Sequence, residues 1–507
     1  MKKLLILSVL LTCWLASYGQ QVSGTITDGD LGDPLIGATI LEKGTDNGTI
    51  TDFDGNFVLD VSTDNPVLEI SFIGYATQEV TYDGTPISIS LLEDSETLDE
   101  VVVVGYGVQK KKVVTGAIAK VKGEDLEDKQ VTRLEQALQG RSAGVTVISG
   151  SGQPGSGAAV KIRGTGTTGN ADPLYVVDGV WIGGGIDYLN SDDIESIEVL
   201  KDASAGIYGV QAAGGVILVT TKKGSGGMKL AYESYIGYQN APRKISVLNG
   251  VEYGIISNEA SVAAGGPILF EDPQSLGEGT DWQDAIFREN APMTSHNFSL
   301  SAGGKKSQYF ASIGYFNQQG IISQDNSNYE RFNLRFNSTH KITDRLTFNN
   351  SIAYARVTAS GVSVNNEFGS PVARAINLDP LTPIYETDSV RLSDPVFANN
   401  AVVTDEGGTF GISEHVSSEI LNPLAALAIQ QGFGWSDKIV SSAFLEYEIL
   451  EGLKFKTSFG ADLAFWGNQN FSPVHFLNAT NRLDINSYSR GQNRGCLLYT
   501  SPSPRDS

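Results

Sequence analysis

Residues 331–356 alternate apolar and polar side chains in two runs, and this period of two constrains the fold more than any other feature of the chain. The apolar side chains of the first run share one face: Phe332, Leu334 and Phe336. Polar side chains alternate with them: Asn333, Arg335 and Asn337. Because successive side chains of a β-strand point to opposite faces of its sheet, the pattern predicts long strands with one apolar face.

The alternation recurs in pairs of runs that short turns separate. After a turn at Thr343 and Asp344 it continues at Leu346, Phe348, Ile352 and Tyr354. It returns on both sides of Glu451-Gly452, at Leu445, Tyr447, Ile449, Leu453, Phe455, Phe459, Leu463 and Phe465. Residues 296–316 form a further predicted hairpin, and a long irregular stretch is predicted at 358–430.

Short turns at one end and long loops at the other are typical of outer-membrane β-barrels. A large soluble β-protein has the same periodicity, with its apolar face turned into a core. Periodicity does not separate these two folds, so the soluble alternative stays open at this point.

The first 20 residues are a predicted secretory signal peptide, because two lysines precede an apolar run at 4–15. No later segment approaches 18 continuous apolar residues, so no transmembrane helix is predicted. The two cysteines, Cys13 and Cys496, leave the exported chain without a disulfide or a thiolate metal site. A membrane-spanning form of this chain would therefore be a barrel.

The chain is acidic, with 58 Asp and Glu against 36 Lys and Arg and a formal net charge of −22. Binding to nucleic acid depends on Lys and Arg, so this balance argues against a nucleic-acid partner. The four histidines are scattered and no H-E-x-x-H motif is present. The sequence thus offers no candidate catalytic residue, metal site or cofactor site.

Residues 21–93 are predicted to form a small β-sandwich. The predicted strands lie in "VSGTITD", "GATILEKGT", "GTITDFDGNFVLDV", "VLEISFIGY" and "ISISL", with Gly, Asp and Asn between them. The segment "TDFDGNF" (51–57) lacks the D-x-[DN]-x-[DN]-G spacing of a calcium loop. We therefore expect a tight hairpin turn there.

Residues 113–227 are predicted to mix helix and strand. A helix is expected over 124–141, because Leu126, Leu134 and Leu138 fall at helical spacing and Gly140 can end it. Asp178-Gly179 predicts a two-residue hairpin turn. Residues 164–169 satisfy G-x-G-x-x-G, but they continue into a strand and not a helix, which argues against a dinucleotide site.

Between these two regions lies "LDEVVVVGYGVQKKK" (98–112), where four valines separate an acidic run from a basic one. The segment is too short to span a bilayer. A β-prone segment on a charged linker suits strand addition to a partner's sheet, in which main-chain hydrogen bonds supply the affinity. The alternative is a buried strand of the preceding sandwich.

The motifs after the sandwich occur in one order: "LDEVVVVGYGVQKKKVVTGAI", "LQGRSAGVTVISGSGQPG", "VKIRGTGT", "PLYVVDGV" and "IESIEVLKDASAGIYGVQAAGGVILVTTKKG". With residues 281–322, they resemble the SusC/RagA type of TonB-dependent transporter from about residue 21 to about residue 490. The resemblance implies a mainly β chain with an N-terminal carboxypeptidase-regulatory-like sandwich, an α+β plug domain and the first strands of a 22-stranded transmembrane β-barrel.

The resemblance also implies domain bounds and functional residues. The bounds are signal peptide 1–20, sandwich 21–93, linker 94–112, plug 113–227 and partial barrel 228–495. A TonB-binding strand is implied at Glu100, Val101, Val102, Val103 and Val104. Residues of the plug motifs, implied to be structural, are Arg163, Asp178, Gly179, Lys201, Asp202 and Tyr208.

The implied activity is import of an oligomeric nutrient across the outer membrane of a Gram-negative bacterium, without any catalysed reaction or cofactor. TonB and its inner-membrane motor would drive it, a SusD-like surface lipoprotein would form a lid, and outer-membrane lipid would surround the barrel. Plug and sandwich would lie on the periplasmic side. Oligosaccharide is preferred over oligopeptide as substrate, and a β-rich surface adhesin without transport is the alternative function.

Two features depart from the family's pattern. Residues 229–490 supply only about six to eight strands, which leaves the barrel unfinished. Residues 496–507, "CLLYTSPSPRDS", break the alternation and resemble the translation of a sequencing-library adaptor. We therefore expect a truncated gene and no biological role for Cys496.

Overall fold

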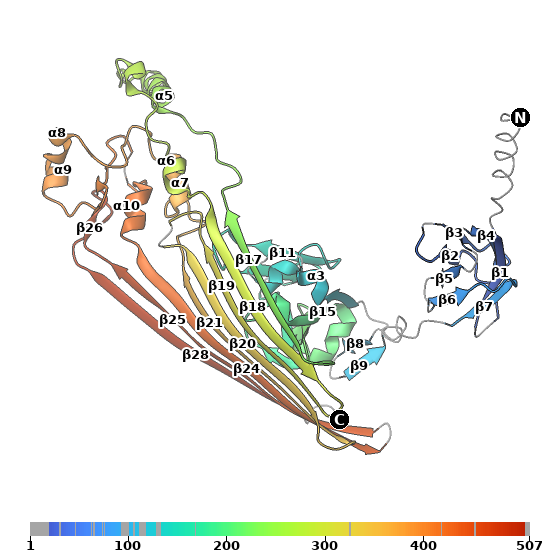
Figure 1. Cartoon of the computed structure of the whole chain (residues 1–507). Coiled ribbons are helices and arrows are strands. Elements are labelled where there is room, and N and C mark those ends of the chain that lie inside the picture. The colour runs from blue at the N-terminus through green and yellow to red at the C-terminus, as the bar shows by residue number, and fades with distance from the viewer. Residues whose placement is uncertain are drawn as a thin grey trace, which may run out of the picture. The chain divides into compact units, whose positions relative to one another are not determined.

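The computed structural model describes residues 20–501 except 30–31, 46, 62, 64–65, 73–74, 76, 93–100, 105–106, 111–117, 128–132, 168, 324–325, 417 and 451–452. The predicted signal peptide therefore lies outside the described residues up to residue 19. The chain divides into two compact units, 1–115 and 116–507, each with its own contacts (Figure 1).

The first unit contains a β-sandwich of two sheets. One sheet has the order β4-β1-β7, with β1 (Gln20–Asp28), β4 (Asn56–Val61) and β7 (Ile87–Leu91). The other has the order β3-β2-β5-β6, with β2 (Thr39–Glu42), β3 (Gly48–Ile50), β5 (Val67–Ser71) and β6 (Gln78–Thr81). Fully buried apolar side chains from both sheets form the core, among them Val22, Ile26, Ile40, Leu68 and Ile70.

The strands expected in the sandwich are confirmed, and β6 is one that the sequence pattern missed. Its residues, Gln78 to Thr81, alternate half-buried and exposed positions and include only one apolar side chain. A tight turn at 51–57 is confirmed, but it is not a hairpin, because it connects β3 of one sheet to β4 of the other. Asp52 Oδ1 accepts hydrogen bonds from the backbone N–H groups of Asp54 and Asn56, at 3.0 and 2.8 Å.

The valine segment forms a hairpin of its own. β8 (Val101–Val104) pairs antiparallel with β9 (Gly107–Lys110) in a two-stranded sheet. Among the described residues no sandwich strand pairs with β8, so the alternative of a strand within the sandwich sheets is wrong. Glu100 lies outside the described residues.

The second unit begins with a mixed region, here called the plug segment (116–227). Its main sheet has the order β10-β15-β16-β13-β14: β10 (Ile118–Lys122), β13 (Leu174–Val177), β14 (Val180–Ile182), β15 (Ile194–Leu200) and β16 (Val216–Thr221). A second sheet pairs β11 (Val145–Ser149) with β12 (Ala158–Ile162). Short helices connect them: α3 (Gly123–Glu127), α4 (Leu134–Ala137), η2 (Ser191–Asp193), η3 (Asp202–Tyr208) and η4 (Val210–Ala212).

The single helix expected over 124–141 is wrong, because α3 and α4 are separate. Arg133, directly before α4, has an extended backbone (φ −129°, ψ 142°), and its Nε donates to Gly155 O at 2.8 Å. This tertiary contact overrides the local helical pattern. Leu126, Leu134 and Leu138 are nevertheless buried, as their spacing predicted.

The turn predicted at Asp178-Gly179 connects β13 and β14. Both residues have positive φ, 48° and 82°, as a type I′ hairpin turn requires. The G-x-G-x-x-G segment (164–169) belongs to the connection that leads into β13, where the described residues form no helix.

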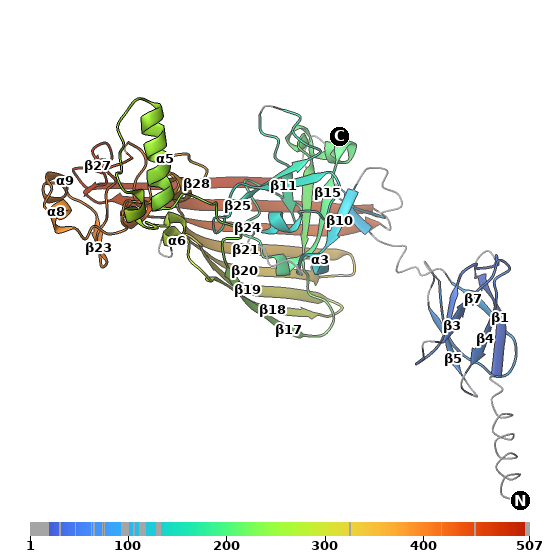
Figure 2. The same ribbon diagram turned by 90° about the horizontal axis from the view of Figure 1, so that it is seen from above.

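The rest of the second unit is one antiparallel eight-stranded sheet, here called the wall, in the order β17-β18-β19-β20-β21-β24-β25-β28 (Figure 2). Its strands are β17 (Lys229–Gln239), β18 (Ala291–Gly303), β19 (Ser307–Gln319), β20 (Asn328–Lys341), β21 (Leu346–Ser360), β24 (Gln431–Leu450), β25 (Leu453–Ser472) and β28 (Ser487–Ser501). The predicted hairpins at 296–316, 331–356 and 441–465 are confirmed.

The burial pattern of the wall decides between the two folds that share its periodicity. Phe332, Leu334 and Phe336 are 36, 37 and 41% exposed, whereas Asn333, Arg335 and Asn337 are 3, 4 and 5% exposed. The polar face therefore packs against the plug segment and the apolar face points outward. A soluble sandwich would have the opposite arrangement, so this pattern favours a wall that faces lipid.

Longer connections gather at one end of the strands (Figure 1). The stretch at 358–430 was expected to be irregular, but β21 extends through Ser360 and short elements follow. The connections contain α5 (Gly250–Ala263), η5 (Pro273–Leu276), α6 (Trp282–Ile286), α7 (Pro371–Asn377), α8 (Ser389–Leu392), α9 (Pro395–Ala398), α10 (Pro423–Ala428), β22 (Thr404–Asp405), β23 (Gly408–Thr409), β26 (His475–Phe476) and β27 (Arg482–Leu483). No described helix is long and apolar enough to cross a membrane.

The C-terminal segment also differs from expectation, because Cys496 to Ser501 continue strand β28. Their backbones pair in register with Leu463 to Ser458 of β25. Strand pairing uses main-chain groups, which are the same for every residue except proline, so the loss of alternation does not end the strand. Residues 502–507 lie outside the described residues, and the adaptor interpretation stays a prediction.

Candidate functional site

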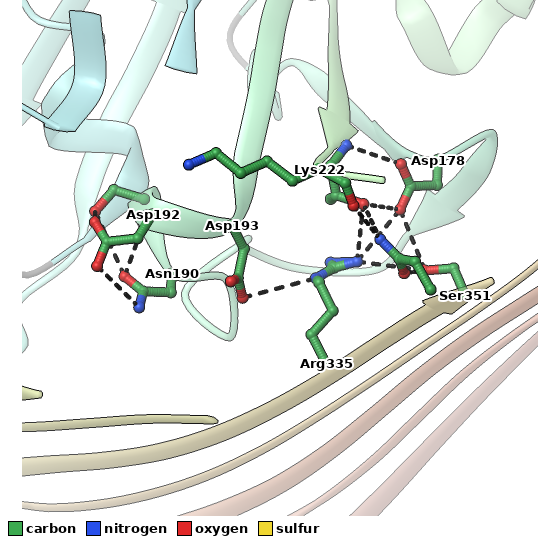
Figure 3. Close-up of polar contacts among 10 residues, drawn as sticks. Asp178, Asn190, Asp192, Asp193, Lys222, Arg335 and Ser351 are labelled. Carbon is green, nitrogen blue, oxygen red and sulfur yellow. Dashed lines mark hydrogen bonds and ion pairs between the residues drawn. The ribbon is translucent and has the colours of Figure 1, made fainter. Parts of the chain in front are cut away.

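Arg335 of β20 lies at the centre of the contact between wall and plug segment (Figure 3). Its NH1 atom is 3.3 Å from Asp178 Oδ2, and its Nε atom is 3.9 Å from Asp193 Oδ2. The three side chains are only 3, 11 and 2% exposed. One guanidinium therefore faces two buried carboxylates, one from the β13–β14 turn and one from the end of η2.

Uncharged groups complete this cluster, here called the Arg335 network. Thr221 donates from its backbone N to Asp178 Oδ1 at 3.0 Å and from its Oγ1 to Asp178 Oδ2 at 2.7 Å. Asn337 Nδ2 donates to Thr221 Oγ1 at 2.9 Å and to Lys222 O at 2.8 Å. Ser351 Oγ donates to Asn337 Oδ1 at 2.7 Å. The network thus joins β16 and the β13–β14 turn to β20 and β21.

The charges in the network depend on one another. Burial raises the pKa of Asp193, and the positive charge of Arg335 opposes that rise. Asp193 Oδ1 has no hydrogen-bond partner among the described residues. Arg335 therefore contributes most to stabilising a charged Asp193 in this interior, and Ser312 and Lys222 add to it.

A second contact holds the glycine-rich loop that follows β14, here called the 183–188 loop. Lys438 of β24 donates from Nζ to Gly183 O at 3.0 Å and to Gly185 O at 3.3 Å. Asp462 of β25 accepts from Gly183 N at 3.0 Å and lies 3.6 Å from Lys438 Nζ. One ion pair of the wall therefore binds both kinds of backbone group in the loop: Lys438 donates to its carbonyls and Asp462 accepts from its N–H.

The same loop contacts a third wall strand, and its own aromatic ring lies against Lys438. Arg331 of β20 donates from NH1 to Asp187 O at 3.0 Å. Lys438 Nζ also lies 4.9 Å from the centre of the Tyr188 ring, within cation–π range. Together these contacts fix the loop against β20, β24 and β25.

On its inner side the loop is held by the start of α4. Glu135 Oε1 accepts from Ile186 N at 3.1 Å, and Arg133 NH1 lies 3.8 Å from Asp187 Oδ2. Glu135 is 4% exposed, and its Oε2 has no hydrogen-bond partner among the described residues. Burial raises the pKa of Glu135, and Arg133 partly offsets the rise.

A cavity of about 420 Å³ lies between the loop and the wall. Its lining includes glycine backbone, two aromatic rings and charged groups: Gly183, Gly184, Gly185, Asp187, Tyr188, Asp437, Lys438, Asp462 and Trp466. Among the described residues, no group of three or more His, Cys, Asp or Glu is placed to hold a metal ion.

Comparisons with known proteins agree with this architecture. Residues 110–216 match the TonB-dependent Receptor Plug Domain family, and residues 22–103 match the CarboxypepD_reg-like domain family. TonB-dependent receptor P26 of Formosa agariphila is 34% identical over 459 residues, which are 89% of this chain and 43% of that protein. TonB-dependent receptor SusC of Bacteroides thetaiotaomicron is 35% identical over 490 residues, 91% of this chain and 46% of that protein.

The chain belongs to the SusC-like TonB-dependent receptors. It spans less than half the length of the two curated relatives. The structure of the RagAB peptide importer in its closed-closed state has the same fold, with a TM-score of 0.62 and 23% identity over 76% of this chain and 45% of that one.

The structure brings one of the six predicted plug residues into the Arg335 network of this receptor. Asp178 lies in it, and Gly179 completes the turn that presents Asp178. Arg163 has φ 57° and donates from its N to Gly144 O at 2.8 Å. Lys201 Nζ donates to Ala143 O at 2.5 Å, a contact between two residues of the plug segment. Tyr208 is buried, at 4% exposed. Asp202 begins η3, and its side chain lies outside the described part of the structure.

The sequence analysis missed the partners of Asp178. Arg335 appeared only as a polar residue of an alternating strand, and Asp193, Lys438 and Asp462 were not singled out. An inward-facing charge on a predicted wall strand was the available signal, because buried charges need partners. The partner itself could not be named, since Arg335 and Asp178 are 157 residues apart.

The predicted TonB-binding strand is described only at its backbone. Val101 to Val104 are in β conformation, and among the described residues β9 is the one strand that pairs with β8. A two-stranded sheet has an edge on each strand to which a further strand can add. That geometry suits the predicted strand addition.

Proposed function

We propose that this receptor imports an oligomeric nutrient across the outer membrane, powered by TonB, and that it catalyses no reaction. The observation that carries the proposal is the inverted burial of the wall around a folded plug segment. Apolar side chains face outward where lipid would lie, and the inward polar face is bound to the plug by the Arg335 network. Because the plug segment fills the space inside the wall and is bound to it, moving the plug to open a path requires work.

TonB would supply that work through residues 100–104. The strand β8 offers an unpaired edge, and the charged linker allows a partner to reach it. Because β-strand addition relies on main-chain N–H and C=O groups, the segment needs β propensity more than particular side chains. Four consecutive valines meet that need.

Force on the N-terminal side of the plug would act on a body held at two places. The Arg335 network and the grip of Lys438 and Asp462 on the 183–188 loop must both break before the plug can leave the wall. These contacts would keep the path closed until TonB is engaged.

The substrate and partners are proposed from the family. Oligosaccharide is the first candidate and oligopeptide the second, the latter because the RagAB structures are those of a peptide importer. A SusD-like lipoprotein would close over the long connections on the outer side. The plug and the sandwich would then face the periplasm.

Three variants of the valine segment test the proposal. Deletion of residues 100–104 and Val102→Pro should each abolish uptake, since proline removes a ladder N–H. Replacement of all four valines by threonine is the matched control, because it keeps the backbone bonds and β propensity, and it should retain most uptake. Uptake and surface binding of labelled substrate are measured separately in cells.

Surface binding should persist in every variant. Uptake that survives both the deletion and Val102→Pro would contradict TonB-driven import. Binding without uptake in the unmodified receptor as well would support the adhesin alternative.

A further inference from the structure

Two neighbouring short turns of the wall carry four cations, here called the basic rim: Lys305, Lys306, Lys341 and Arg345. All four are exposed. The two turns that contain them lie side by side, since Lys341 N donates to Lys306 O at 2.8 Å. Residues 303–307 and 341–346 contain one carboxylate, Asp344. Two neighbouring carboxylates belong to β24: Glu446, which is paired with Lys454 at 3.1 Å, and Glu448, whose backbone N donates to Arg345 O at 2.8 Å.

Aromatic and apolar side chains adjoin the basic rim on the outward face. The His340 ring lies 5.3 Å from the Tyr309 ring and 6.5 Å from the Phe348 ring. Further along the same end, Ile342 is 59% exposed and Leu453 is 52% exposed. Aromatic rings followed by cations mark the level at which a membrane protein leaves the hydrocarbon region and meets headgroups.

The position of the rim matches the span of a membrane strand. From Phe332 to His340 the outward face of β20 covers nine residues, and a transmembrane β-strand needs about 9–11. The lysines and Arg345 begin directly beyond that span. Their long apolar stems can follow the outward face while their charged ends reach the headgroups.

The opposite end of the wall has the reverse charge. The connection at 240–290 has eight carboxylates and three cations, and the connection at 361–430 has nine carboxylates and two cations. In a chain with a formal charge of −22, a cluster of four exposed cations is therefore a local feature of the turn end.

We propose that the basic rim binds the phosphate groups of anionic phospholipids in the leaflet that surrounds the short turns. The inference rests on the proposed function, because it requires the wall to cross a bilayer. Each Lys or Arg near an anionic surface strengthens attraction to it, so the rim enriches such lipid around the receptor. It also fixes how deep the turns lie.

The test uses the receptor expressed from its own gene and reconstituted in vesicles of equal parts phosphatidylethanolamine and phosphatidylglycerol. After extraction in mild detergent, native mass spectrometry measures the phosphatidylglycerol that stays bound. The rim variant carries Lys305→Gln, Lys306→Gln, Lys341→Gln and Arg345→Gln. The matched control loses four exposed cations at the other end: Arg243→Gln, Lys244→Gln, Arg482→Gln and Arg490→Gln.

The unmodified receptor should retain phosphatidylglycerol over phosphatidylethanolamine, the control should behave alike, and the rim variant should lose that preference by about tenfold. Equal retention by rim variant and control would overturn the inference while insertion into the vesicles still supports the proposed function. Failure of the unmodified receptor to insert would instead count against the proposed function. If the rim variant does not fold, the Lys305→Gln/Lys306→Gln pair gives the same comparison with a smaller loss.

Discussion

At the scale of single residues, the receptor concentrates buried charge where the plug meets the wall. Arg335 faces Asp178 and Asp193, and Glu135 holds the 183–188 loop with one oxygen while its other oxygen has no hydrogen-bond partner in the described part of the chain. A buried ion pair contributes little when intact, but removal of one partner leaves an uncompensated charge that is costly. The plug is therefore sensitive to the loss of its partner charge on the wall.

Arg335→Met should lower the free energy of plug opening by about 3–5 kcal/mol, because two carboxylates then stay buried without a cation. Hydrogen exchange of the β15 and β16 amides measures that opening. The matched control is Arg356→Met, since Arg356 pairs with Asp437 at 2.7 Å but its side chain is 49% exposed, and the change should cost no more than about 1 kcal/mol. Adding Asp178→Asn and Asp193→Asn to Arg335→Met should recover part of the loss. Equal effects of the two arginine variants would contradict the network's role.

Glu135→Gln should make the plug more stable at neutral pH. Burial raises the pKa of Glu135 above its ordinary value of 4.5, so the folded plug holds this proton more tightly than the unfolded chain does. The stability that depends on protonated Glu135 is therefore complete below the pKa of the unfolded chain. It is lost as pH rises through the pKa of the folded plug. The protection factor of the Ile186 amide, which is its intrinsic exchange rate divided by its measured one, should fall from about pH 4.5 upward in the unmodified receptor and stay level in the variant. The assignment would be refuted if the pH dependence of Ile186 protection were the same in the variant and in the unmodified receptor.

At the scale of elements, the 183–188 loop is the part of the plug segment that both the wall and α4 hold. The loop contains three successive glycines, and its position depends on contacts supplied by neighbouring elements: α4 on one side and β20, β24 and β25 on the other. Ile186 and Tyr188 of the loop also belong to the hydrophobic core of the plug segment, so the polar contacts with the wall add to an apolar anchor.

Lys438→Met should free the loop, since both loop carbonyls lose their donor. It also leaves Asp462 of β25 buried without its cation, so some local loss of stability is expected in the wall beside the loop. We expect amides 183–188 to exchange at least about tenfold faster, with the more distant wall strands β17 and β18 unchanged. Lys161→Met is the control, because Lys161 pairs with Asp172 within the plug segment, away from the wall. Protection of the loop that persists in Lys438→Met would show that this grip is dispensable.

The elements also show which features local sequence can predict. Asp178-Gly179 was predicted as a turn because positive φ at both residues restricts the choice of side chains. The helix predicted over 124–141 was wrong because Arg133 has an extended backbone, and its side chain is bound to Gly155, which is distant in sequence. Strand β6 was missed because its four residues lack an apolar alternation, and strand β28 continues past Gly495 because its pairing with β25 is made by the main chain.

At the scale of the whole molecule, the periodicity predicted strands with an apolar face but could not say which face is inside. That depends on what fills the space beside the sheet, a property of the fold and not of one strand. The plug segment fills it with polar groups, so Asn333 and Arg335 are buried and Phe332 and Phe336 are exposed. Only part of the candidate site was therefore predictable from sequence. The turn at Asp178 could be predicted locally, whereas Arg335 is recognised only once its burial in the structure is known.

The central claim, a lipid-facing wall around a plug, is tested most directly by spin labels along β20. Single cysteines at Leu334 and Phe336 (outward) and at Asn333 and Asn337 (inward) are placed in a Cys496→Ser receptor in vesicles. The labels at 334 and 336 should collide with oxygen dissolved in the bilayer and not with a water-soluble nickel chelate, whereas those at 333 and 337 should be shielded from both. Collision of the labels at 334 and 336 with the water-soluble chelate would contradict the claim.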